Sequence, residues 1–351
     1  MKIGIIGAGF YGCYIASRLS KKHDITIFEK NSSLLSEAAK NNQYRLHQGY
    51  HYPRCKKTID QTFRGYKKFK KEFKEYLYFP KNNYYLIHKN SLIDFSTYTK
   101  SMSKNLKLIK IKASKIKYIK NPQDYLGAVN TKEGVILLDK LLPNLGLKIK
   151  KNCDLKLNSF VKRIVPDEAR LVLSNKKEYK FDFIINCTYL NPNLGLNKKN
   201  KFNLKYELAA LVIPTIKIKS IPGITIMDGK FVSLYPRNKN SFSISSVKYT
   251  PVKKFSKLSQ MSLYLKKMKI DPFKSKIKKK IIEDFNQYID LKIRQRDTKI
   301  EFAIKTKFKD DKNDIRTANI RCNKKVLSVM SGKLDAAPII FENINKYLKK
   351  L

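Results

Sequence analysis

The sequence has few cysteines and histidines and no long apolar run, and each of these features excludes a kind of site or a class of protein. The five cysteines include no C-x-x-C pair, which fits a reduced cytosolic setting and gives no metal site. The four histidines lack the spacing of metal ligands, so no metal is expected. No apolar run is long enough to span a bilayer. A predicted first strand starting at Lys2 leaves no room for a targeting peptide, so a cytoplasmic protein is expected.

Acidic residues are also scarce. The chain has 28 of them against 75 basic residues, which gives a formal charge of +47. Only 11 of the basic residues are arginine, and the lysines are spread through every segment, which indicates compositional bias better than one designed basic face. Proteins that read sequence use arginine for base contacts. We therefore expect no specific nucleic-acid partner, while an anionic substrate or a membrane-surface contact stays open.

What the sequence does contain is a glycine motif near its start. Gly7-Ala8-Gly9-Phe10-Tyr11-Gly12 lies between a predicted strand, residues 2–6, and a predicted helix that runs through residue 19. A second strand, residues 25–28, ends on Glu29, with Lys30 beside it. This is the G-x-G-x-x-G dinucleotide fingerprint in the context that it requires.

Each part of the fingerprint has a physical role. Gly7 permits the tight turn out of the strand, Gly9 lets the backbone approach a pyrophosphate, and Gly12 lets helix and strand pack closely. The N–H groups at the start of the helix attract phosphates. Glu29 can accept hydrogen bonds from a ribose diol. The sequence therefore predicts a bound dinucleotide, and the motif alone does not say which one.

The rest of the chain shows no repeat and no long linker, so it is predicted to form one interleaved unit. A helix-prone stretch, residues 31–40, precedes a predicted amphipathic helix at residues 63–77. The apolar run at residues 181–188 is typical of a parallel strand buried on both faces. A β-rich stretch is predicted at residues 206–246, and two helical stretches at residues 256–268 and 277–288. A strand, a glycine turn and a helix close the sequence at residues 326–348. The fold class is predicted to be α/β with a β-rich second domain.

Several features together favour FAD over NAD. The fingerprint lies at the extreme N-terminus, the Rossmann sheet resumes only near Val161 and residues 181–188, and a second glycine turn lies at the C-terminus. The chain resembles the D-amino-acid-oxidase-like superfamily of FAD-dependent oxidoreductases, which includes glycine, sarcosine and hydroxyglutarate oxidases. The segment around Val161 is similar to the family segment whose valine backbone contacts adenine. The resemblance covers nearly the whole chain.

Two further segments carry the resemblance toward the flavin. Ile184-Ile185-Asn186-Cys187-Thr188 looks like the family's buried strand that ends in a flavin-facing turn, and Ser331-Gly332-Lys333 looks like its C-terminal flavin-contact turn. Cys187, Thr188, Gly332 and Lys333 are therefore expected cofactor contacts. Cys187-Thr188-Tyr189 departs from the usual small-Thr-Gly, and Ser331-Gly332-Lys333 departs from the commoner Gly-His-Gly, which leaves the substrate open.

The resemblance implies a Rossmann-type FAD-binding domain interleaved with a β-rich substrate domain. We expect the FAD-binding domain at residues 1–80, 131–200 and 321–351, and the substrate domain at residues 81–130 and 201–320. The expected reaction is oxidation of a C–N or C–O bond of a small amine, amino acid or hydroxy acid by hydride transfer to flavin N5. Lys333 is the candidate charge beside flavin N1 and O2, the alternative being a surface lysine.

Three other functions stay open at this point. The same fingerprint would suit an NAD(P)-dependent dehydrogenase, a non-redox flavoprotein such as a nucleotide-sugar mutase, or a basic binding protein with a degenerate nucleotide fold. The oligomeric state, the electron acceptor and any covalent attachment of the flavin are not predicted.

The densest unusual cluster runs from Arg45 to Arg54, with the sequence RLHQGYHYPR. In a strand, His47 and His51 would share one face with Gly49 between them, and the tyrosines would lie on the other face. We interpret the cluster as a wall of the flavin and substrate site. Arg45 or Arg54 would pair with an anion, and His47 or His51 would contact the flavin ring. The alternative is a hydrogen-bonded structural turn.

A second candidate pair ends a strand of the substrate domain. Tyr235 and Arg237 could hold a carboxylate through one bond from the tyrosine and two from the arginine. An exposed turn formed by Pro236, Arg237 and Asn238 is the competing interpretation. The predicted catalytic set is therefore His47, His51, Arg45, Tyr235 and Arg237, and Arg45 and His47 are also predicted cofactor contacts.

Overall fold

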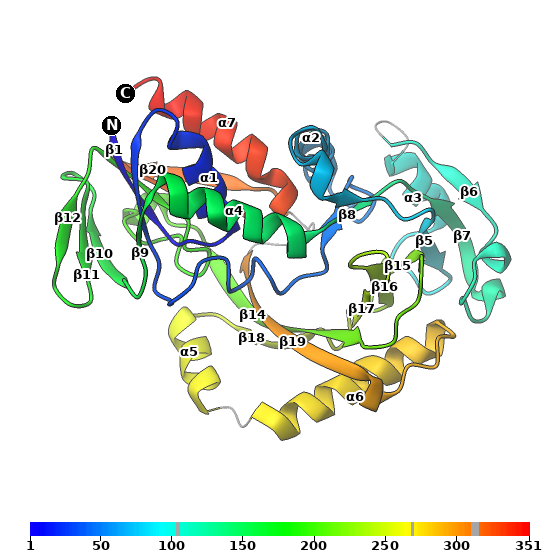
Figure 1. Ribbon diagram of the computed structural model, residues 1–351. Coiled ribbons are helices and arrows are strands. Elements are labelled where there is room, and N and C mark those ends of the chain that lie inside the picture. The colour runs from blue at the N-terminus through cyan, green and yellow to red at the C-terminus, as the bar shows by residue number, and fades with distance from the viewer. Residues whose placement is uncertain (103–105, 268–269, 310–315) are drawn as a thin grey trace.

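The computed structural model describes residues 1–102, 106–267, 270–309 and 316–351. One half of the structure, called the N-terminal half because it contains β1, is built on a six-stranded sheet in the order β20-β21-β13-β1-β2-β9, three of whose strands come from later in the chain (Figure 1). Five of these strands run parallel, and β20 pairs antiparallel at one edge. The strands are β1 (Lys2–Ile6), β2 (Asp24–Phe28), β9 (Asp154–Lys156), β13 (Phe183–Asn186), β20 (Asn319–Asn323) and β21 (Val326–Met330).

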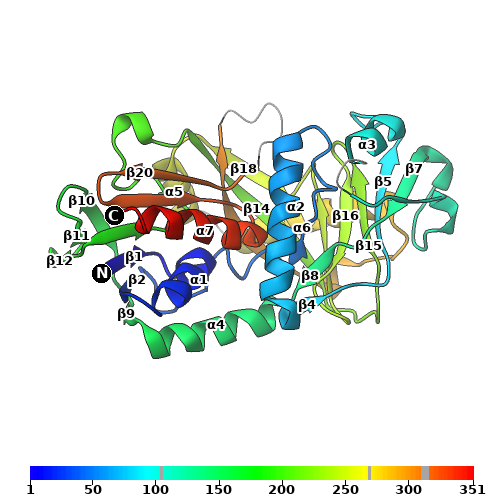
Figure 2. The same cartoon turned by 90° about the horizontal axis from the view of Figure 1, so that it is seen from above.

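Three helices accompany this sheet: α1 (Phe10–Leu19), α4 (Leu138–Asn152) and α7 (Ala337–Leu348). They lie side by side in Figures 1 and 2, with α1 in contact with both of the others. Burial of their apolar faces against β1, β2 and β13 forms the core of this half. The chain order of strand, turn, helix and parallel strand is that of a dinucleotide-binding unit.

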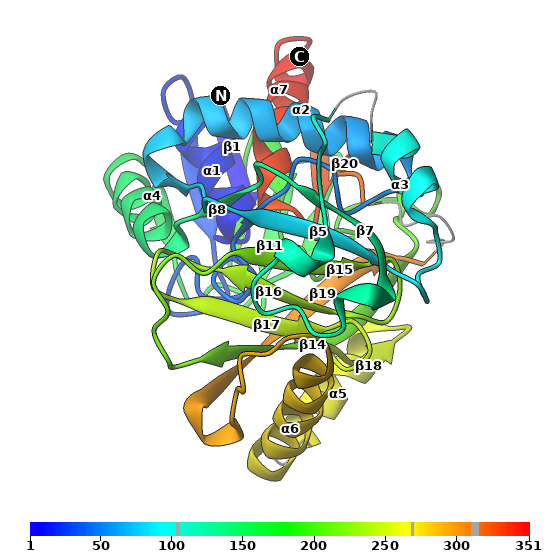
Figure 3. The same ribbon diagram turned by 90° about the vertical axis from the view of Figure 1, so that its right-hand side faces the viewer.

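The other half is a nine-stranded sheet in the order β18-β14-β17-β16-β15-β5-β7-β6, with β19 also paired to β14. Helices α5 (Leu258–Lys267) and α6 (Ile270–Tyr288) lie below it in Figure 3, and α3 (Phe95–Met102) lies near β7. The strands are β5 (Asn83–His88), β6 (Ile109–Ile111), β7 (Tyr125–Asn130), β14 (Leu204–Pro214), β15 (Gly223–Met227), β16 (Val232–Pro236), β17 (Phe242–Ser246), β18 (Pro251–Phe255) and β19 (Thr298–Phe308).

The two faces of this large sheet differ in chemistry. The face toward α6 is apolar and forms one core with residues of that helix, including Ile281 and Phe285. On the opposite face the antiparallel register places Thr225 beside Ser233 and Tyr235 beside Ser243. Because side chains alternate along a strand, these polar groups share one face. That face contacts the N-terminal half, since the Tyr235 hydroxyl donates to the Gly134 carbonyl oxygen at 2.8 Å.

Two small sheets and one long helix complete the architecture. Strands β3 (Arg45–Leu46), β8 (Gly134–Ile136) and β4 (Leu77–Tyr78) form one sheet, and β10 (Val161–Val165), β11 (Arg170–Leu173) and β12 (Glu178–Lys180) form the other. Helix α2 (Lys56–Glu72) crosses the junction of the two halves (Figure 2). It packs against α7 and the short helix η6 (Leu334–Ala336), where a Cβ at Gly65 would lie 2.8 Å from the Asp335 carbonyl oxygen.

The structure confirms the predicted α/β fold class with its parallel sheet and β-rich second part. The buried parallel strand expected at residues 181–188 is β13, which lies between β1 and β21. The predicted helix at residues 31–40 is wrong, because these residues form bends and turns. Leu35 there adopts a φ of +59° and its N–H donates to the Ala8 carbonyl oxygen. This long-range tie replaces helical hydrogen bonds.

Two predicted helices can be compared with α5 and α6. α6 begins seven residues before the stretch predicted at 277–288, and α5 lies within the stretch predicted at 256–268, whose last residue falls outside the described ranges. Among the described residues, no helix combines the length and the apolar character needed to cross a bilayer. The strands within residues 81–130 and 201–320 belong to the large sheet, except β20, which begins at Asn319 and lies in the six-stranded sheet. The division into two domains stays a prediction.

Candidate functional site

The glycine fingerprint forms a tight loop between β1 and α1. Gly7 has a φ of +94°, and a Cβ at Gly12 would lie 1.9 Å from the Gly7 carbonyl oxygen, so both positions require glycine. A Cβ at Gly9 would meet nothing within 4 Å, so this side of the loop is open. Helix α1 has no side-chain cap, which leaves the N–H groups of its first turn free for an anion.

Glu29 organises the same loop from the end of β2. Its buried carboxylate accepts from the Ala8 N–H at 2.8 Å and from the Asn31 N–H at 3.0 Å. A carboxylate has further lone pairs for a hydroxyl donor. Lys30 points outward and pairs with Glu37 at 3.2 Å, while the Phe10 side chain is buried in the aromatic core and offers only its backbone to the loop.

The C-terminal turn meets the fingerprint helix directly. The Tyr11 hydroxyl lies 2.5 Å from the Lys333 carbonyl oxygen and 2.8 Å from Ser331 Oγ. Lys333 Nζ donates to Thr62 Oγ1 at 2.5 Å and lies 3.7 Å from the centre of the Tyr52 ring. Burial lowers the pKa of Lys333 to about 8, against a smaller opposing effect of Asp335. Lys333 is therefore a partly enclosed cation beside the junction.

The end of β13 forms the third loop of this junction. A Cβ at Gly7 would lie 3.0 Å from the Cys187 carbonyl oxygen, so the fingerprint and β13 loops touch. Thr188 Oγ1 is buried with no hydrogen-bond partner among the described residues. Burial raises the pKa of the Cys187 thiol. Val161 packs in one cluster with Ile6 and Phe28, which places it near the ends of β1 and β2.

These loops all lie where parallel strands end, and this edge of an α/β sheet is where such folds bind ligands. The polar face of the large sheet approaches from the other side. The predicted contacts Gly7 to Gly12, Glu29, Cys187, Thr188, Gly332 and Lys333 are therefore neighbours around one edge, although they come from three distant parts of the chain.

Arg45 is a buried cation whose hydrogen bonding is incomplete among the described residues. Its side chain is buried, its Nη1 donates to Thr225 Oγ1 at 2.9 Å, and its guanidinium carbon lies 4.1 Å from the centre of the Tyr235 ring. The Nε and Nη2 atoms are buried and have no partner among the described residues. A buried guanidinium without a carboxylate is costly unless an anion or another acceptor completes it.

His47 and His51 lie together beside Arg45, with ring centres 5.7 Å apart. His47 Nδ1 lies 3.8 Å from Glu133 Oε1, while 17% of the His47 side chain remains exposed. His51 is enclosed, and burial together with Arg45, His47, Lys333 and Arg316 holds its pKa well below the usual range. The two histidines therefore differ in their access to solvent.

Glu133 was not singled out from the sequence, yet it is at the centre of this cluster. The carboxylate is fully buried and accepts from the Gln48 N–H at 2.7 Å and from the Tyr85 hydroxyl at 2.6 Å. Burial alone would raise its pKa, but His47 and these two hydrogen bonds hold the pKa below its usual value. Its only sequence signal is an acidic residue directly before a buried strand, which is too weak to identify a site residue.

The strand alternation predicted for residues 47–52 is wrong. Only Arg45 and Leu46 are in a strand, and Gly49, at a φ of +122°, turns the chain so that the Tyr52 N–H donates to the Gly49 carbonyl oxygen. The Tyr52 ring then contacts both histidines, with centres 5.8 Å and 5.4 Å away. The turn, rather than a strand face, brings the histidines together.

The other predicted polar residues already have protein partners. Tyr235 donates to Gly134 and forms the platform under Arg45. The Arg237 guanidinium donates to Glu301 at 3.3 Å and stacks over the Tyr44 ring. Arg54 Nε donates to Asp228 at 2.6 Å. The structure therefore does not direct Tyr235 and Arg237 toward one shared ligand.

Lys305 on β19 is a second residue that the sequence did not reveal. Its side chain is exposed. The neighbouring Thr306 N–H donates to the Tyr189 hydroxyl at 3.1 Å, so this part of β19 adjoins the end of β13. Lys305 therefore lies close to the same junction.

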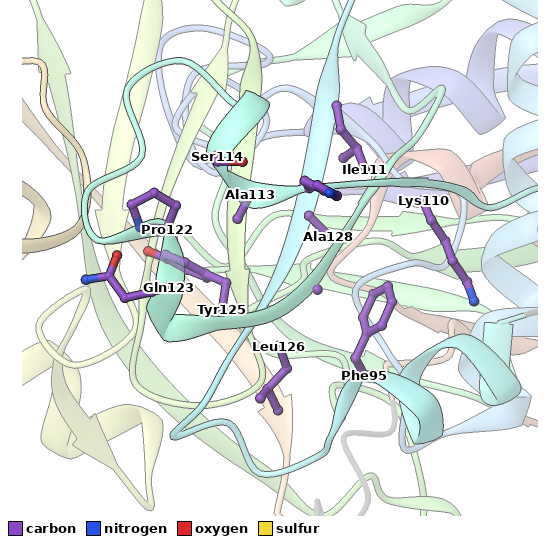
Figure 4. A pocket seen from close by; sticks show the side chains of 12 residues that line it. Phe95, Lys110, Ile111, Ala113, Ser114, Pro122, Gln123, Tyr125, Leu126 and Ala128 are labelled. Atoms are coloured by element: carbon purple, nitrogen blue, oxygen red, sulfur yellow. The ribbon is translucent and has the colours of Figure 1, made fainter.

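A separate open groove lies far along the large sheet (Figure 4). It has a volume of about 700 Å³ and is formed by β6, β7 and the short helices between them, with Phe95, Lys110 and Leu126 among its lining residues. None of the residues predicted to bind the cofactor or substrate lines it. We therefore assign the candidate site to the junction and not to this groove.

The residues at the junction fit a flavin dinucleotide. The open side at Gly9 and the uncapped helix suit a pyrophosphate, and Glu29 suits a ribose. Farther along, buried polar atoms without partners occur on Arg45, His47, His51 and Thr188. Such atoms are rare unless a ligand or water completes them.

Comparisons with known proteins agree with this geometry. The family described as FAD dependent oxidoreductase matches residues 2–263. A protein named FAD-dependent monooxygenase FPY4, from Fusarium mangiferae, is 28% identical over 97% of this chain and 89% of its own length.

Solved structures share the fold at low identity. NikD, an amino acid oxidase essential for nikkomycin biosynthesis, superposes with a TM-score of 0.74 at 11% identity over 97% of this chain and 91% of its own. L-α-glycerophosphate oxidase from Mycoplasma pneumoniae, solved with FAD bound, gives a TM-score of 0.71 at 16% identity over 97% and 92% of the two chains.

Proposed function

The chain belongs to the D-amino-acid-oxidase-like family of FAD-dependent oxidoreductases, and on that premise we propose that it oxidises a C–N or C–O bond of a small anionic substrate. FAD is the cofactor, which removes the nicotinamide and the cofactor-free alternatives. When bound, FAD supplies the acceptor for the hydride that leaves the substrate carbon.

The proposal assigns the two ends of the cofactor to different loops. The loop from Gly7 to Gly12 and Glu29 would hold the pyrophosphate and the adenosine ribose, and Val161 would lie near the adenine. Cys187, Thr188, Gly332 and Lys333 would contact the flavin. Support comes from the open side at Gly9, the unpartnered Thr188 hydroxyl and the cationic Lys333 at the C-terminal turn.

The observation that carries the proposed substrate class is the incomplete bonding of Arg45. Among the described residues, two buried guanidinium nitrogens of Arg45 lack acceptors and no carboxylate pairs with it, in contrast to Arg237, which has Glu301. A carboxylate would accept from both nitrogens in a bidentate arrangement. The Lys333 cation, which with Arg45 acts on His51, favours the same sign of charge. An amino acid or a hydroxy acid fits this requirement better than a neutral amine.

A monooxygenase is the second candidate. It is favoured by the similarity to FPY4, which extends over almost the whole of both chains. The two functions differ in the source of the electrons. An oxidase or dehydrogenase takes them from its substrate, whereas a monooxygenase of this kind takes them from an external reductant and places oxygen in its product.

Anaerobic mixing tests both candidates. The FAD-loaded protein is mixed with amino acids, hydroxy acids and the corresponding neutral amines and alcohols, and the flavin absorbance is followed. The proposal expects bleaching by an acid but not by its amide, and a rise in KM of at least about tenfold, with FAD retained, in Arg45→Met, because the anion loses its charged partner. Arg54→Met is the matched control, since Arg54 is paired with Asp228.

The results separate the candidates clearly. Bleaching that requires NADH or NADPH, with a hydroxylated product under air, would favour the monooxygenase. Equal bleaching by acids and their amides, or an unchanged KM in Arg45→Met, would overturn the assignment of Arg45 to an anion.

A further inference from the structure

We propose that Glu133 is a positioning residue for His47: it orients the imidazole and fixes its tautomer so that Nε2 accepts the substrate's proton. The inference rests on the proposed function and deepens it, since it selects one of two adjacent histidines. Oxidation of an amine or alcohol carbon breaks an N–H or O–H bond as well as a C–H bond. The proton from the N–H or O–H bond goes to His47 Nε2.

The geometry around Glu133 supports this role. Its Oε1 atom lies 3.8 Å from His47 Nδ1, an ion-pair distance, and also accepts from the Gln48 N–H, which belongs to the residue next to His47. The Tyr85 hydroxyl holds the other oxygen. The carboxylate is thus fixed from both sides and has no freedom to leave the imidazole. The bond to Gln48 also ties the backbone beside His47 to the same group.

The carboxylate also determines which ring nitrogen carries the proton. Nδ1 makes no hydrogen bond to a described residue, but the negative charge 3.8 Å away favours an N–H over a lone pair at this nitrogen, so the neutral imidazole keeps its lone pair on Nε2. His47 Nδ1 is buried, yet 17% of the side chain is exposed, so the accessible part of the ring lies away from Nδ1. Nε2 is the only other titratable atom of the ring.

His51 does not meet these requirements, although it is a neighbour. It is enclosed, no carboxylate pairs with it, and Arg45, His47, Lys333 and Arg316 all disfavour its charged form. The ionisable groups that interact with His47 among the described residues are Glu133, the buried carboxyl of Asp335 on η6, and His51. Among them Glu133 is the carboxylate in ion-pair contact with the ring.

The test is a 15N NMR spectrum of the FAD-loaded protein with labelled histidine, in which the chemical shifts of Nδ1 and Nε2 report which ring nitrogen carries the proton in each of the four histidines. In Glu133→Gln we expect His47 to lose its preference for the Nδ1–H tautomer, because the favourable charge is removed. The His51 signals should change little. The His47 signals are assigned with His47→Gln. Glu133→Asp, which keeps the charge, should keep the tautomer of the wild type.

The kinetic readout is the pH profile of anaerobic flavin reduction. The plateau rate should be about tenfold lower in Glu133→Gln, because less of the His47 ring then has its lone pair on Nε2. Asp284→Asn is the matched control, because Asp284 is another buried carboxyl, hydrogen-bonded to Ser246 on the α6 side of the sheet. It should change neither measurement.

The outcomes distinguish this inference from the proposed function. An unmoved His47 resonance in Glu133→Gln overturns the positioning role whatever the substrate is. If Glu133→Gln fails to fold, a wild-type spectrum in which the neutral His47 ring carries its proton on Nε2 has the same effect. A shifted resonance in a protein whose flavin no acid reduces supports the positioning role and overturns the proposed oxidation.

Discussion

At the scale of single residues, the site is defined by which charges have partners. Arg45 and Lys333 have the same residue types as three other cations, Arg54, Arg237 and Lys30. In the structure each of these three pairs with a carboxylate. Arg45 keeps two buried donors without acceptors. Burial with incomplete bonding therefore separates the binding candidates from the structural cations, and neither property can be read from residue type.

His51 gives a prediction about stability and pH. Its pKa lies well below the ordinary value because of burial and nearby cations, so the native state keeps it neutral. Below about pH 6.5 the unfolded chain takes up a proton that the native state does not, so stability falls by up to about 1.4 kcal/mol per pH unit. His51→Gln should reduce this slope. Urea unfolding at pH 7.5, 6.5 and 5.5 measures it.

The comparison needs a histidine whose loss leaves the slope mostly intact. His23 lies at the surface end of the turn after α1, where burial lowers its pKa less completely. Equal slopes in the wild type and His51→Gln, or a larger change in His23→Gln, would show that His51 is not held neutral by its surroundings.

At the scale of elements, the loop before α1 allows the effect of a substitution on FAD affinity to be measured apart from its effect on the free energy of unfolding. Gly9→Ala adds a methyl group to open space, so the unfolding free energy should change by less than about 1 kcal/mol, whereas FAD affinity should fall at least tenfold because the methyl occupies the phosphate side. Gly12→Ala drives a methyl into the Gly7 carbonyl oxygen and should also lose about 1–3 kcal/mol of stability.

Chemical denaturation of the cofactor-free proteins and titration with FAD provide the two measurements. The decisive comparison is between the variants. If Gly9→Ala loses as much stability as Gly12→Ala, the open side of the loop is part of the packing. If Gly9→Ala binds FAD as the wild type does, the pyrophosphate does not lie there.

Local patterns predicted those elements whose hydrogen bonds are local or whose faces are uniformly apolar. The fingerprint, α1 and the apolar β13 followed from periodicity and glycine spacing. The helix predicted at residues 31–40 failed because a long-range bond from Leu35 to Ala8 determines the backbone there. Glu133 was missed for a related reason: it lies 85 residues from Gln48 along the chain, and no local pattern links them.

At the scale of the whole molecule, the site exists only where the two halves meet. The parallel sheet contributes loops at its strand ends, the large sheet contributes a polar face, and α2 and the C-terminal turn lie between them (Figures 1 and 2). The apolar face of the large sheet is covered by α6. This division explains why one sheet face can carry buried polar groups such as Tyr235 and Ser243 without disrupting a core.

The formal charge of +47 gives the last prediction. If the charge is a compositional bias, binding to DNA should come from counterion release alone. We expect two duplexes of unrelated sequence to bind equally at 50 mM salt and to lose about 10³-fold in affinity by 200 mM. FAD should lose far less, because the contacts proposed for it, backbone N–H groups at the start of α1 and Glu29, are largely hydrogen bonds. Fluorescence anisotropy and FAD titration at both salt concentrations measure this difference. A preference for one duplex, or DNA binding that persists at 200 mM salt, would show that the lysines form a specific surface.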